Sequence, residues 1–284
     1  MSPADVEVHR RAIDERLRTV VGDATPGRLS EQMGDAVLSG GKRVRPTLTL
    51  LVCSAAGGDP EGETALDFAA GVELVHTASL VVDDIIDRSP VRRGEPSAWA
   101  RSGHGAAIVT SNGLLGEAFA LFSADPRATE AVADALVELG EGEATELVDQ
   151  PADEAAYMEL ARRKTGALFR AAAELGAIAA DADAHTVEAV GEYAERVGVA
   201  FQLRDDVLDE TGDGDTLGKP PGRDAAMDRP SVLQVTDRSP EAVTELAREE
   251  ADAALRALDR VERGPGDARG YLEELAEFVV ERER

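Results

Sequence analysis

The stretch "SLVVDDIIDRSPVRRGEP", residues 79–96, places three aspartates at the end of an apolar run and follows them with two adjacent arginines. The apolar residues before the aspartates recur at three- and four-residue spacing back to about residue 62, which predicts a long apolar helix over 62–87. Asp83 and Asp87 are four residues apart and therefore share one face of that helix, with Asp84 beside them. The segment thus predicts a helix that ends in a cluster of carboxylates.

The same helical pattern covers nearly the whole chain. Ala, Leu and Glu are abundant, alternating Val/Ile/Thr runs bounded by hairpin turns are absent, and no period of 20–50 residues indicates a solenoid. The sequence therefore predicts an all-α protein, one large helical bundle that forms a single domain over residues 1–284. Helices are expected over 4–21, 28–38, 45–57, 62–87, 104–124, 128–148, 153–178, 184–211, 240–260 and 268–282.

Composition narrows the classes of function. The 284 residues include 56 acidic and 30 basic side chains, for a formal charge of -26, which repels nucleic acid, so no nucleic-acid partner is expected. No uncharged apolar run approaches the ~20 residues of a membrane span, and the charged N-terminus is unlike a signal peptide. We therefore expect a cytoplasmic protein without stable membrane insertion. Acidity spread along the whole chain is best tolerated in concentrated salt, which predicts a halophilic source.

The single cysteine, Cys53, lies in the apolar run "TLTLLVCSAA". One cysteine excludes an internal disulfide and argues against a cysteine-based metal site. We expect Cys53 to be a small buried hydrophobic residue.

A second Asp-Asp-x-x-Asp cluster ends another apolar helix and repeats the geometry of the first. It comprises Asp205, Asp206 and Asp209 in "FQLRDDVLD". Carboxylates this close raise one another's pKa unless a cation lies between them. Mg²⁺ fits better than Ca²⁺, because it is typically held by one or two protein carboxylates and completes its shell with water and phosphate oxygens. The two clusters predict a magnesium site that acts on a phosphate-bearing substrate.

The basic residues suit the same substrate. The chain has only three lysines, Lys42, Lys164 and Lys219, and each lies in a segment with Gly, Thr or Arg that suits phosphate contact. In "GGKRVRP" the glycines allow the backbone to approach an anion closely, and Arg92 and Arg93 add two bidentate guanidinium groups. These groups are suited to diphosphates.

Taken in order, these motifs resemble those of the trans-isoprenyl diphosphate synthases, the polyprenyl synthetase family. The resemblance covers roughly residues 29–233 and rests on "GGKRVRP" (40–46), "ELVHTASLVVDDIID" (73–87) with "RRGEPS" (92–97), "KTGALF" (164–169), "FQLRDDVLD" (201–209) and "LGKPPGRD" (217–224). It implies an isoprenoid-synthase bundle with a central cavity, a homodimer, and Mg²⁺-dependent head-to-tail condensation of isopentenyl diphosphate with an allylic diphosphate, releasing diphosphate.

The resemblance also implies roles for individual residues. Metal ligands are expected at Asp83, Asp87, Asp205 and Asp209, with Asp84 and Asp206 supporting them. Contacts with the allylic substrate are expected from Arg92, Lys164, Thr165, Gln202 and Lys219. Contacts with isopentenyl diphosphate are expected from Lys42, Arg45, His76 and Arg93. Arg229 stands where the family has a late substrate-binding lysine. The catalytic set is expected to be Asp83, Asp84, Asp87, Arg92, Lys164, Asp205 and Lys219.

Product length is expected to depend on the helix that carries Asp83. Ala78 and Ser79, one turn earlier, are small and let a long chain pass, although Phe119 or Phe122 can still form the floor. Geranylgeranyl diphosphate is the expected product for a haloarchaeal source. A longer geranylfarnesyl or polyprenyl product is the alternative.

Besides Arg229, the chain departs from the family pattern at further positions: Ser111-Asn112 replace Gly-Asp, Glu143 and Glu146 replace Gln and Asp, and Trp99 replaces His. These departures leave open a non-catalytic subunit of a heteromeric synthase. A terpene cyclase is a further alternative, but two separate basic segments argue against it, since a cyclase has no second diphosphate to hold.

Overall fold

The structure, a computed structural model, describes residues 3–211, 230–262 and 267–281. Lys219 and Arg229, together with the motif at 217–224, lie outside the described residues. The all-α prediction is confirmed, and the predicted helices recur with boundaries shifted by a few residues.

Helices account for most of the described chain, and their bounds are as follows. They are α1 (Pro3–Gly22), α2 (Gly27–Leu38), α3 (Val44–Ala55), α4 (Glu63–Ile86), α5 (Ala98–Ser102), α6 (His104–Phe122), α7 (Pro126–Ala144), α8 (Glu154–Ala161), α9 (Ala167–Ala179), α10 (Ala184–Thr211), α12 (Val232–Val235), α13 (Pro240–Leu258) and α14 (Ala268–Glu281). Two π-helical turns, η1 (Thr145–Asp149) and η2 (Arg162–Gly166), and two short strands, β1 (Val91–Arg92) and β2 (Glu95–Pro96), complete the description.

Four features differ from the prediction. The expected helix over 128–148 passes into η1, and the one over 153–178 is interrupted by η2. An extra residue in a helical turn leaves little trace in apolar periodicity, so the sequence did not reveal these turns. The helices α5 and α12 are too short for a periodic signal. The hairpin of β1 and β2, which pairs Arg92 with Glu95, was also not expected.

Helix α4 lies at the centre of the bundle. Its side chains are apolar on nearly every face, and most of those from Ala65 to Val81 are buried. It packs against α6 on one side and against α3 and α9 on the other, and α9 in turn packs against α7 and α10. Cys53, on α3, is fully buried as expected. A helix that is apolar all round is stable only inside such a bundle.

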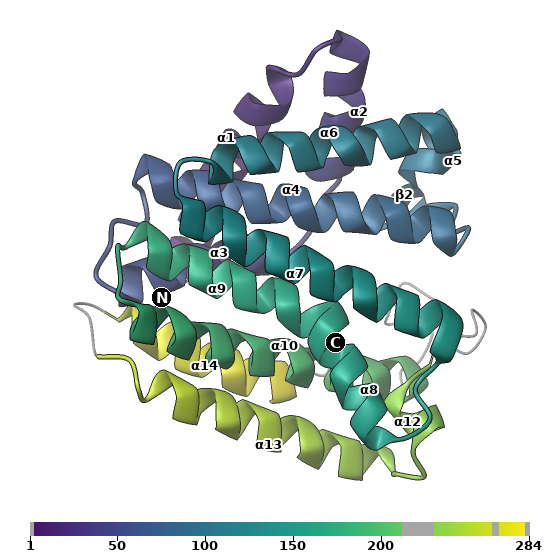
Figure 1. The fold of residues 1–284 in the computed structure, drawn as a ribbon, viewed down its shortest axis with the longest axis vertical. Helices are drawn as coiled ribbons and strands as arrows, with labels where there is room; N and C mark the ends of the chain where they lie inside the picture. The colour runs from purple at the N-terminus through teal and green to yellow at the C-terminus, as the bar shows by residue number, and fades with distance from the viewer. Residues whose placement is uncertain (1–2, 212–229, 263–266, 282–284) are drawn as a thin grey trace.

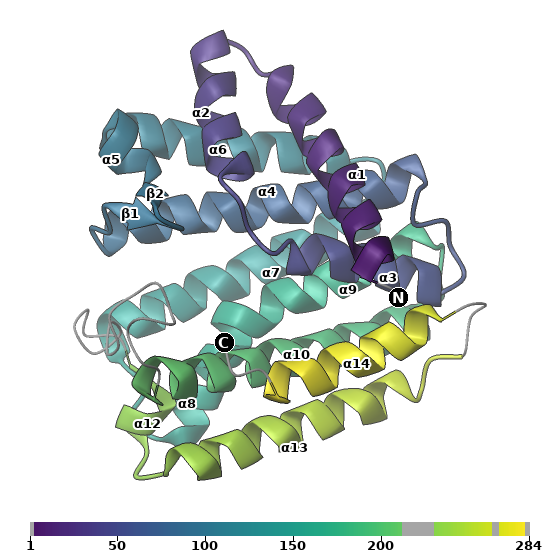
Figure 2. The same ribbon diagram turned by 180° about the vertical axis from the view of Figure 1, so that it is seen from behind.

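The carboxyl ends of α4 and α10 lie at the same end of the molecule, with α7 and α9 between the two helices, as Figures 1 and 2 show from opposite sides. A close approach of η2 to α10 supports this arrangement. A Cβ at Gly198 would lie 3.0 Å from the Cα of Gly166, so a larger residue would separate the two elements. The fold thus directs both predicted carboxylate clusters toward one end.

Two helices, α4 and α6, are long and apolar enough to cross a membrane by length and composition alone. In α4, 67% of the apolar segment is buried within the bundle, which explains why this helix is apolar. In α6 only 33% is buried. Helix α6 therefore presents an apolar face to the outside of this chain.

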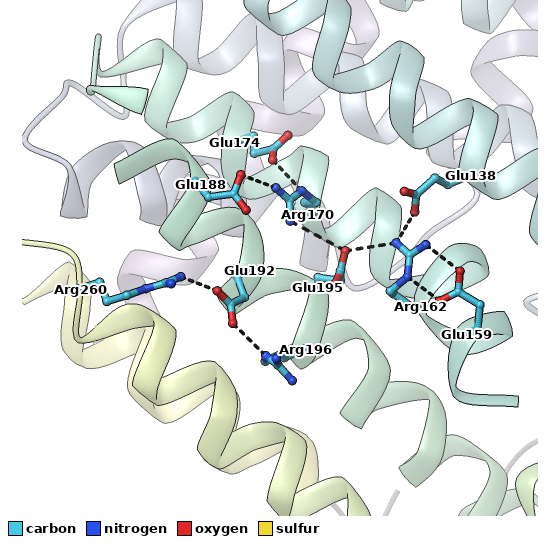
Figure 3. A network of polar contacts seen from close by, with 10 residues as sticks. All are labelled: Glu138, Glu159, Arg162, Arg170, Glu174, Glu188, Glu192, Glu195, Arg196 and Arg260. Carbon is cyan, nitrogen blue, oxygen red and sulfur yellow. Dashed lines mark hydrogen bonds and ion pairs between the residues drawn. The ribbon is translucent and has the colours of Figure 1, made fainter. Parts of the chain in front are cut away.

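Arginines neutralise part of the acidic surface around α9 and α10. Figure 3 shows arginines paired with glutamates along α7, α8, η2, α9 and α10, together with Arg260 just after α13. Arg162 contacts Glu138 at 2.6 Å and Glu159 at 2.8 Å, and its guanidinium lowers the pKa of Glu159 to about 2. Burial has the opposite effect on Glu174 and raises its pKa to about 7. Such pairs are individually weak, but they reduce repulsion within a strongly acidic chain.

Candidate functional site

The last turn of α4 carries the first carboxylate cluster. Asp83 and Asp87 are half-buried, whereas Asp84 is buried and accepts a hydrogen bond of 2.8 Å from Nε of Arg92. Asp84 therefore holds the arginine of the following hairpin, while the other two aspartates lie on the more accessible face. The supporting role expected for Asp84 stays a prediction.

The hairpin after α4 brings a second basic segment to the loop before α3. Arg93 donates a hydrogen bond to the carbonyl of Gly40. Gly41 has a φ of +132°, and a Cβ there would lie 2.7 Å from Nη1 of Arg93. Only glycine tolerates both the backbone conformation and this contact. The loop at 40–46 and the arginine pair, 50 residues apart in sequence, thus meet in space.

Arg45 and His76 form the centre of this basic cluster. Nη1 of Arg45 lies 3.3 Å from Nε2 of His76, and the Arg45 guanidinium lies 4.5 Å from the ring centroid of Phe169. Because an arginine can only donate, Nε2 of His76 is the acceptor and carries no proton. Nε of Arg45 is buried and has no hydrogen-bond partner within the described part of the chain.

The electrostatics of the cluster favour an anion. Burial, followed by the charges of Arg45 and Arg93, holds the pKa of His76 well below its usual value. Burial also lowers the pKa of Arg45 to about 10 and lowers that of Arg93. Arg45 is thus desolvated and Arg93 partly so, and their positive charges disfavour a proton on His76, so the cluster favours an anion. Of the residues predicted to bind isopentenyl diphosphate, the structure brings Arg45, His76 and Arg93 together.

The other two basic residues of the loop at 40–46 have different surroundings. Lys42 is exposed and lines a groove between α3 and α14, together with Tyr271 and Phe278. Arg43 is buried, and all three of its nitrogens have partners within the protein. The structure thus separates three cations that are adjacent in sequence.

A second polar cluster lies where α7 meets η2. Lys164 on η2 forms an ion pair of 3.0 Å with Glu143 and a further one with Glu146. Oε1 of Glu143 is buried without a hydrogen-bond partner among the described residues. The two departures from the family pattern at these positions therefore contact a predicted catalytic lysine. π-Helical turns often occur at functional sites, and here η2 carries both Lys164 and Thr165.

The second carboxylate cluster is divided in the same way as the first. Asp206 is buried and accepts hydrogen bonds from Nε2 of Gln202 at 3.0 Å, from the backbone of Val232 at 2.8 Å and from the hydroxyl of Tyr157. Gln202 in turn accepts a hydrogen bond of 2.8 Å from Thr165. Asp205 is exposed and Asp209 is half-buried. Asp206 therefore fixes the end of α10.

The donor set suits a hard divalent cation. Asp83 and Asp87 supply carboxylate oxygens at one helix end, and Asp205 and Asp209 supply them at the other. Within residues 3–211, 230–262 and 267–281, no three His, Cys, Asp or Glu side chains are gathered into a metal cage. Two ligands from each helix, completed by water and phosphate, is the arrangement that Mg²⁺ prefers over a full protein cage. The residues present therefore fit this ion.

The predicted length-determining residues lie on α4, one turn before Asp83. Ala78 is buried, and its carbonyl accepts a hydrogen bond of 3.1 Å from Ser111 on α6. Ser79 is half-buried. Phe122 packs where a Cβ of Gly71 would lie, at 2.5 Å, two helical turns before Ala78. The departure at Ser111 thus joins α6 to α4.

Sequence reasoning missed several residues that support the site. Glu73 contacts Arg43, Tyr157 contacts Asp206, and Trp99 donates a hydrogen bond of 3.0 Å to the carbonyl of Ser89. Trp99 also stacks on His104 at 4.9 Å and so holds the basic hairpin against α6. A buried acid such as Glu73 in the middle of an apolar helix is a signal, since it requires a partner. Tyr157 gave no comparable signal.

Comparisons with known proteins agree with this geometry. The family model for polyprenyl synthetase matches residues 27–259. A short chain isoprenyl diphosphate synthase from Methanothermobacter thermautotrophicus is 38% identical over 231 residues, which cover 78% of this chain and 70% of that protein.

Solved structures show the same fold. The geranylgeranyl pyrophosphate synthetase from Pyrococcus horikoshii has a TM-score of 0.89 and is 31% identical, with 99% of this chain and 98% of that chain covered. A polyprenyl synthase from Caulobacter crescentus, complexed with calcium and isoprenyl diphosphate, has a TM-score of 0.84 and is 30% identical, with 99% and 95% covered.

Proposed function

Because the chain belongs to the polyprenyl synthetase family, we propose that it condenses isopentenyl diphosphate with an allylic diphosphate, head to tail and in the trans configuration, and releases diphosphate. The observation that carries this proposal is the cluster of Arg45, His76 and Arg93, in which His76 lies on the helix that ends in the first carboxylate pair, while the second pair ends α10 at the same end of the bundle. It offers a cationic site for one diphosphate and an anionic site that needs a metal for the other.

Isopentenyl diphosphate binds at the cationic site. The guanidinium groups of Arg45 and Arg93 contact its diphosphate, and the unpartnered Nε of Arg45 supplies a donor. His76, neutral at its Nε2, orients Arg45 from the other side. Lys42, exposed on the same loop, approaches when the anion is present. The apolar side chains of α4 and α9 then keep the hydrocarbon part of the substrate away from water.

The allylic diphosphate binds at the anionic site. Asp83 and Asp87, with Asp205 and Asp209, would hold Mg²⁺, which would supply positive charge to the leaving diphosphate. The Caulobacter relative complexed with calcium and isoprenyl diphosphate supports a divalent ion beside the substrate. Arg92, Lys164, Thr165 and Gln202 bind and orient the substrate, and Lys219 joins them by resemblance.

The allylic carbon–oxygen bond then ionises and the isopentenyl double bond attacks the resulting cation. Residues that complement the charge separating in this step accelerate it. The departing diphosphate removes the final proton.

One assay tests the reaction. The purified protein is incubated in high salt with isopentenyl diphosphate, Mg²⁺ and each of dimethylallyl, geranyl and farnesyl diphosphate, and the products are identified. We expect elongated prenyl diphosphates. A cyclic hydrocarbon would instead identify a cyclase, and no product from any primer would identify a non-catalytic subunit.

Geranylgeranyl diphosphate is the proposed product. Ala78 and Ser79 put small side chains on α4 about one turn before Asp83. Phe122 packs against Gly71, which precedes Asp83 by 12 residues, about 18 Å along the helix axis. A Ser79→Phe variant is expected to shorten the main product by at least one isoprene unit, because the ring enters the path of the chain. Chromatography of the dephosphorylated products measures this, and an unchanged product would remove Ser79 from the length control.

We also propose a homodimer that forms through α6. Ile108 and Val109 are 50% and 53% exposed, and the exposed positions of this helix from Gly105 to Ala120 carry no charge in a protein of net charge -26. An uncharged apolar face of this kind is typical of a subunit interface. An Ile108→Glu/Val109→Glu variant is expected to elute as a monomer in light-scattering chromatography, whereas the native chain elutes as a dimer. A native monomer would overturn this assignment.

A further inference from the structure

Arg43, the middle basic residue of "GGKRVRP", has a different environment from its neighbours. Its side chain is only 3% exposed, and its three nitrogens each donate to a different element of the bundle. Nε contacts Asp14 of α1 at 2.9 Å, Nη1 contacts Glu73 of α4 at 2.6 Å, and Nη2 contacts the carbonyl of Val37 in the last turn of α2 at 2.8 Å. With its donors engaged in this way, Arg43 is not a substrate ligand.

The backbone at Arg43 is held in an unfavourable conformation. Arg43 has a φ of +53°, in the left-handed region, and it immediately precedes α3. This conformation is unfavourable for a residue with a Cβ, and it persists where the surroundings over-determine it. The three hydrogen bonds of the guanidinium provide that constraint.

This constraint sets the position of the anion-binding residues. Arg45, which follows Arg43 by two residues, lies beside His76, and His76 is one turn after Glu73 on α4. Helix α4 therefore carries both Glu73, which holds the loop through Arg43, and His76, which contacts Arg45. Gly40 and Gly41, on the other side of Arg43, contact Arg93.

We propose that Arg43 is a positioning residue for isopentenyl diphosphate: anchored to Asp14, Glu73 and the end of α2, it fixes the loop that presents Arg45 to the diphosphate and that holds Arg93 through the carbonyl of Gly40. The inference rests on the proposed function of this cluster. The allylic site is built from η2, Arg92 and the ends of α4 and α10, and none of these accepts a hydrogen bond from Arg43.

The chain offers a matched control. Arg16 of α1 contacts Asp67 of α4 and so also joins these two helices, but it does not belong to the loop. Arg16→Met and Arg43→Met each remove one arginine bridge between α1 and α4. Only Arg43→Met is expected to disturb the binding cluster.

The test compares Michaelis constants for the two substrates in these variants. For Arg43→Met we expect KM for isopentenyl diphosphate to rise at least about tenfold, because small displacements of binding groups are costly, with KM for the allylic substrate changed less than about twofold. For Arg16→Met we expect both constants to stay within about twofold of the native values. Equal rises in both constants for Arg43→Met, or no rise, would overturn the proposal.

A second variant separates positioning from stability. Arg43→Met leaves Glu73 as an unpaired buried charge and lowers the melting temperature, whereas Arg43→Met/Glu73→Gln removes both charges and is expected to recover most of that loss. We expect KM for isopentenyl diphosphate to stay raised in the double variant. Recovery of KM together with stability would show that Arg43 acts only by neutralising Glu73, contrary to the proposal.

Failure of the proposed function is recognised separately. If the native chain elongates no primer, the reaction assignment is wrong, and the same comparison is made with calorimetric binding of isopentenyl diphosphate. Weaker binding in Arg43→Met than in Arg16→Met supports the positioning role even then, and equal binding overturns it.

Discussion

The two diphosphate sites proposed for this chain differ in whether nearby carboxylates neutralise their cationic side chains. Around Arg45 and His76, cationic side chains gather, and burial lowers the pKa of both residues. The charges of nearby arginines lower the pKa of His76 further, and the buried Nε of Arg45 has no hydrogen-bond partner among the described residues. At η2, by contrast, Lys164 is already ion-paired with Glu143 and Glu146. The first site is prepared for an anion, and the second holds a surplus of negative charge.

This difference indicates how each substrate is bound. A diphosphate at the first site replaces repulsion between cations with attraction, so it needs no added ion. A diphosphate at the second site meets Asp83, Asp87, Asp205 and Asp209 in addition to the paired lysine, so it needs a metal to bridge like charges. Three measurements test this contrast.

Metal removal has the largest expected effect. With a chelator present, we expect calorimetry to show that binding of an allylic diphosphate is lost while binding of isopentenyl diphosphate changes less than about twofold, because only the first depends on the metal. In Mg²⁺, Asp83→Ala and Asp205→Ala are each expected to lower the rate at least ~10²-fold, as expected when a catalytic metal is lost. Asp259→Ala, on the distant surface pair with Arg269, is the control. An equal loss of binding for the two substrates would contradict the proposed difference between the sites.

Glu143 has an intermediate expected effect. Glu143→Gln removes one carboxylate from Lys164, and we expect KM for the allylic diphosphate to fall about fivefold, equivalent to ~1 kcal/mol for a charge partly screened by solvent. Glu141→Gln, which affects only the exposed pair with Arg163, should leave KM unchanged. Steady-state kinetics measure both. An increased KM in Glu143→Gln would show that the carboxylate aids binding.

The smallest expected effect concerns the pKa of His76, which is measured by NMR titration. Its pKa is held well below 6.5, so NMR of the free protein should show no titration of this ring between pH 6 and 8. Inorganic diphosphate adds negative charge and should raise that pKa. Because the folded state binds the proton less readily than the unfolded state, His76 also makes the free energy of unfolding decrease as pH falls through about 6.5, and His76→Gln should reduce this decrease. An ordinary pKa in the free protein would contradict the crowding of cations.

Part of this site is readable from the sequence because it depends on local geometry. Carboxylates four residues apart on a helix share one face wherever the helix lies, so Asp83 and Asp87 could be paired without a structure. The apolar pattern likewise predicted the long helices, and the ordered motifs predicted the family. A buried role for Cys53 followed from the apolar run around it.

Other roles were decided by tertiary packing. Arg43 and Arg45 are two residues apart and chemically identical, yet one is an internal anchor and the other faces His76. The same holds for Asp205 and Asp206, of which only the second is buried among Tyr157, Gln202 and Val232.

The physical reason is that the function of a charged group depends on which partners reach it and how much water remains. The distant partners come from α1, α4, α8 and α12, far away in sequence. The sequence alone therefore determined the helices, the paired carboxylates and the family. Only the folded chain decided which charges bind one another and which remain for substrate.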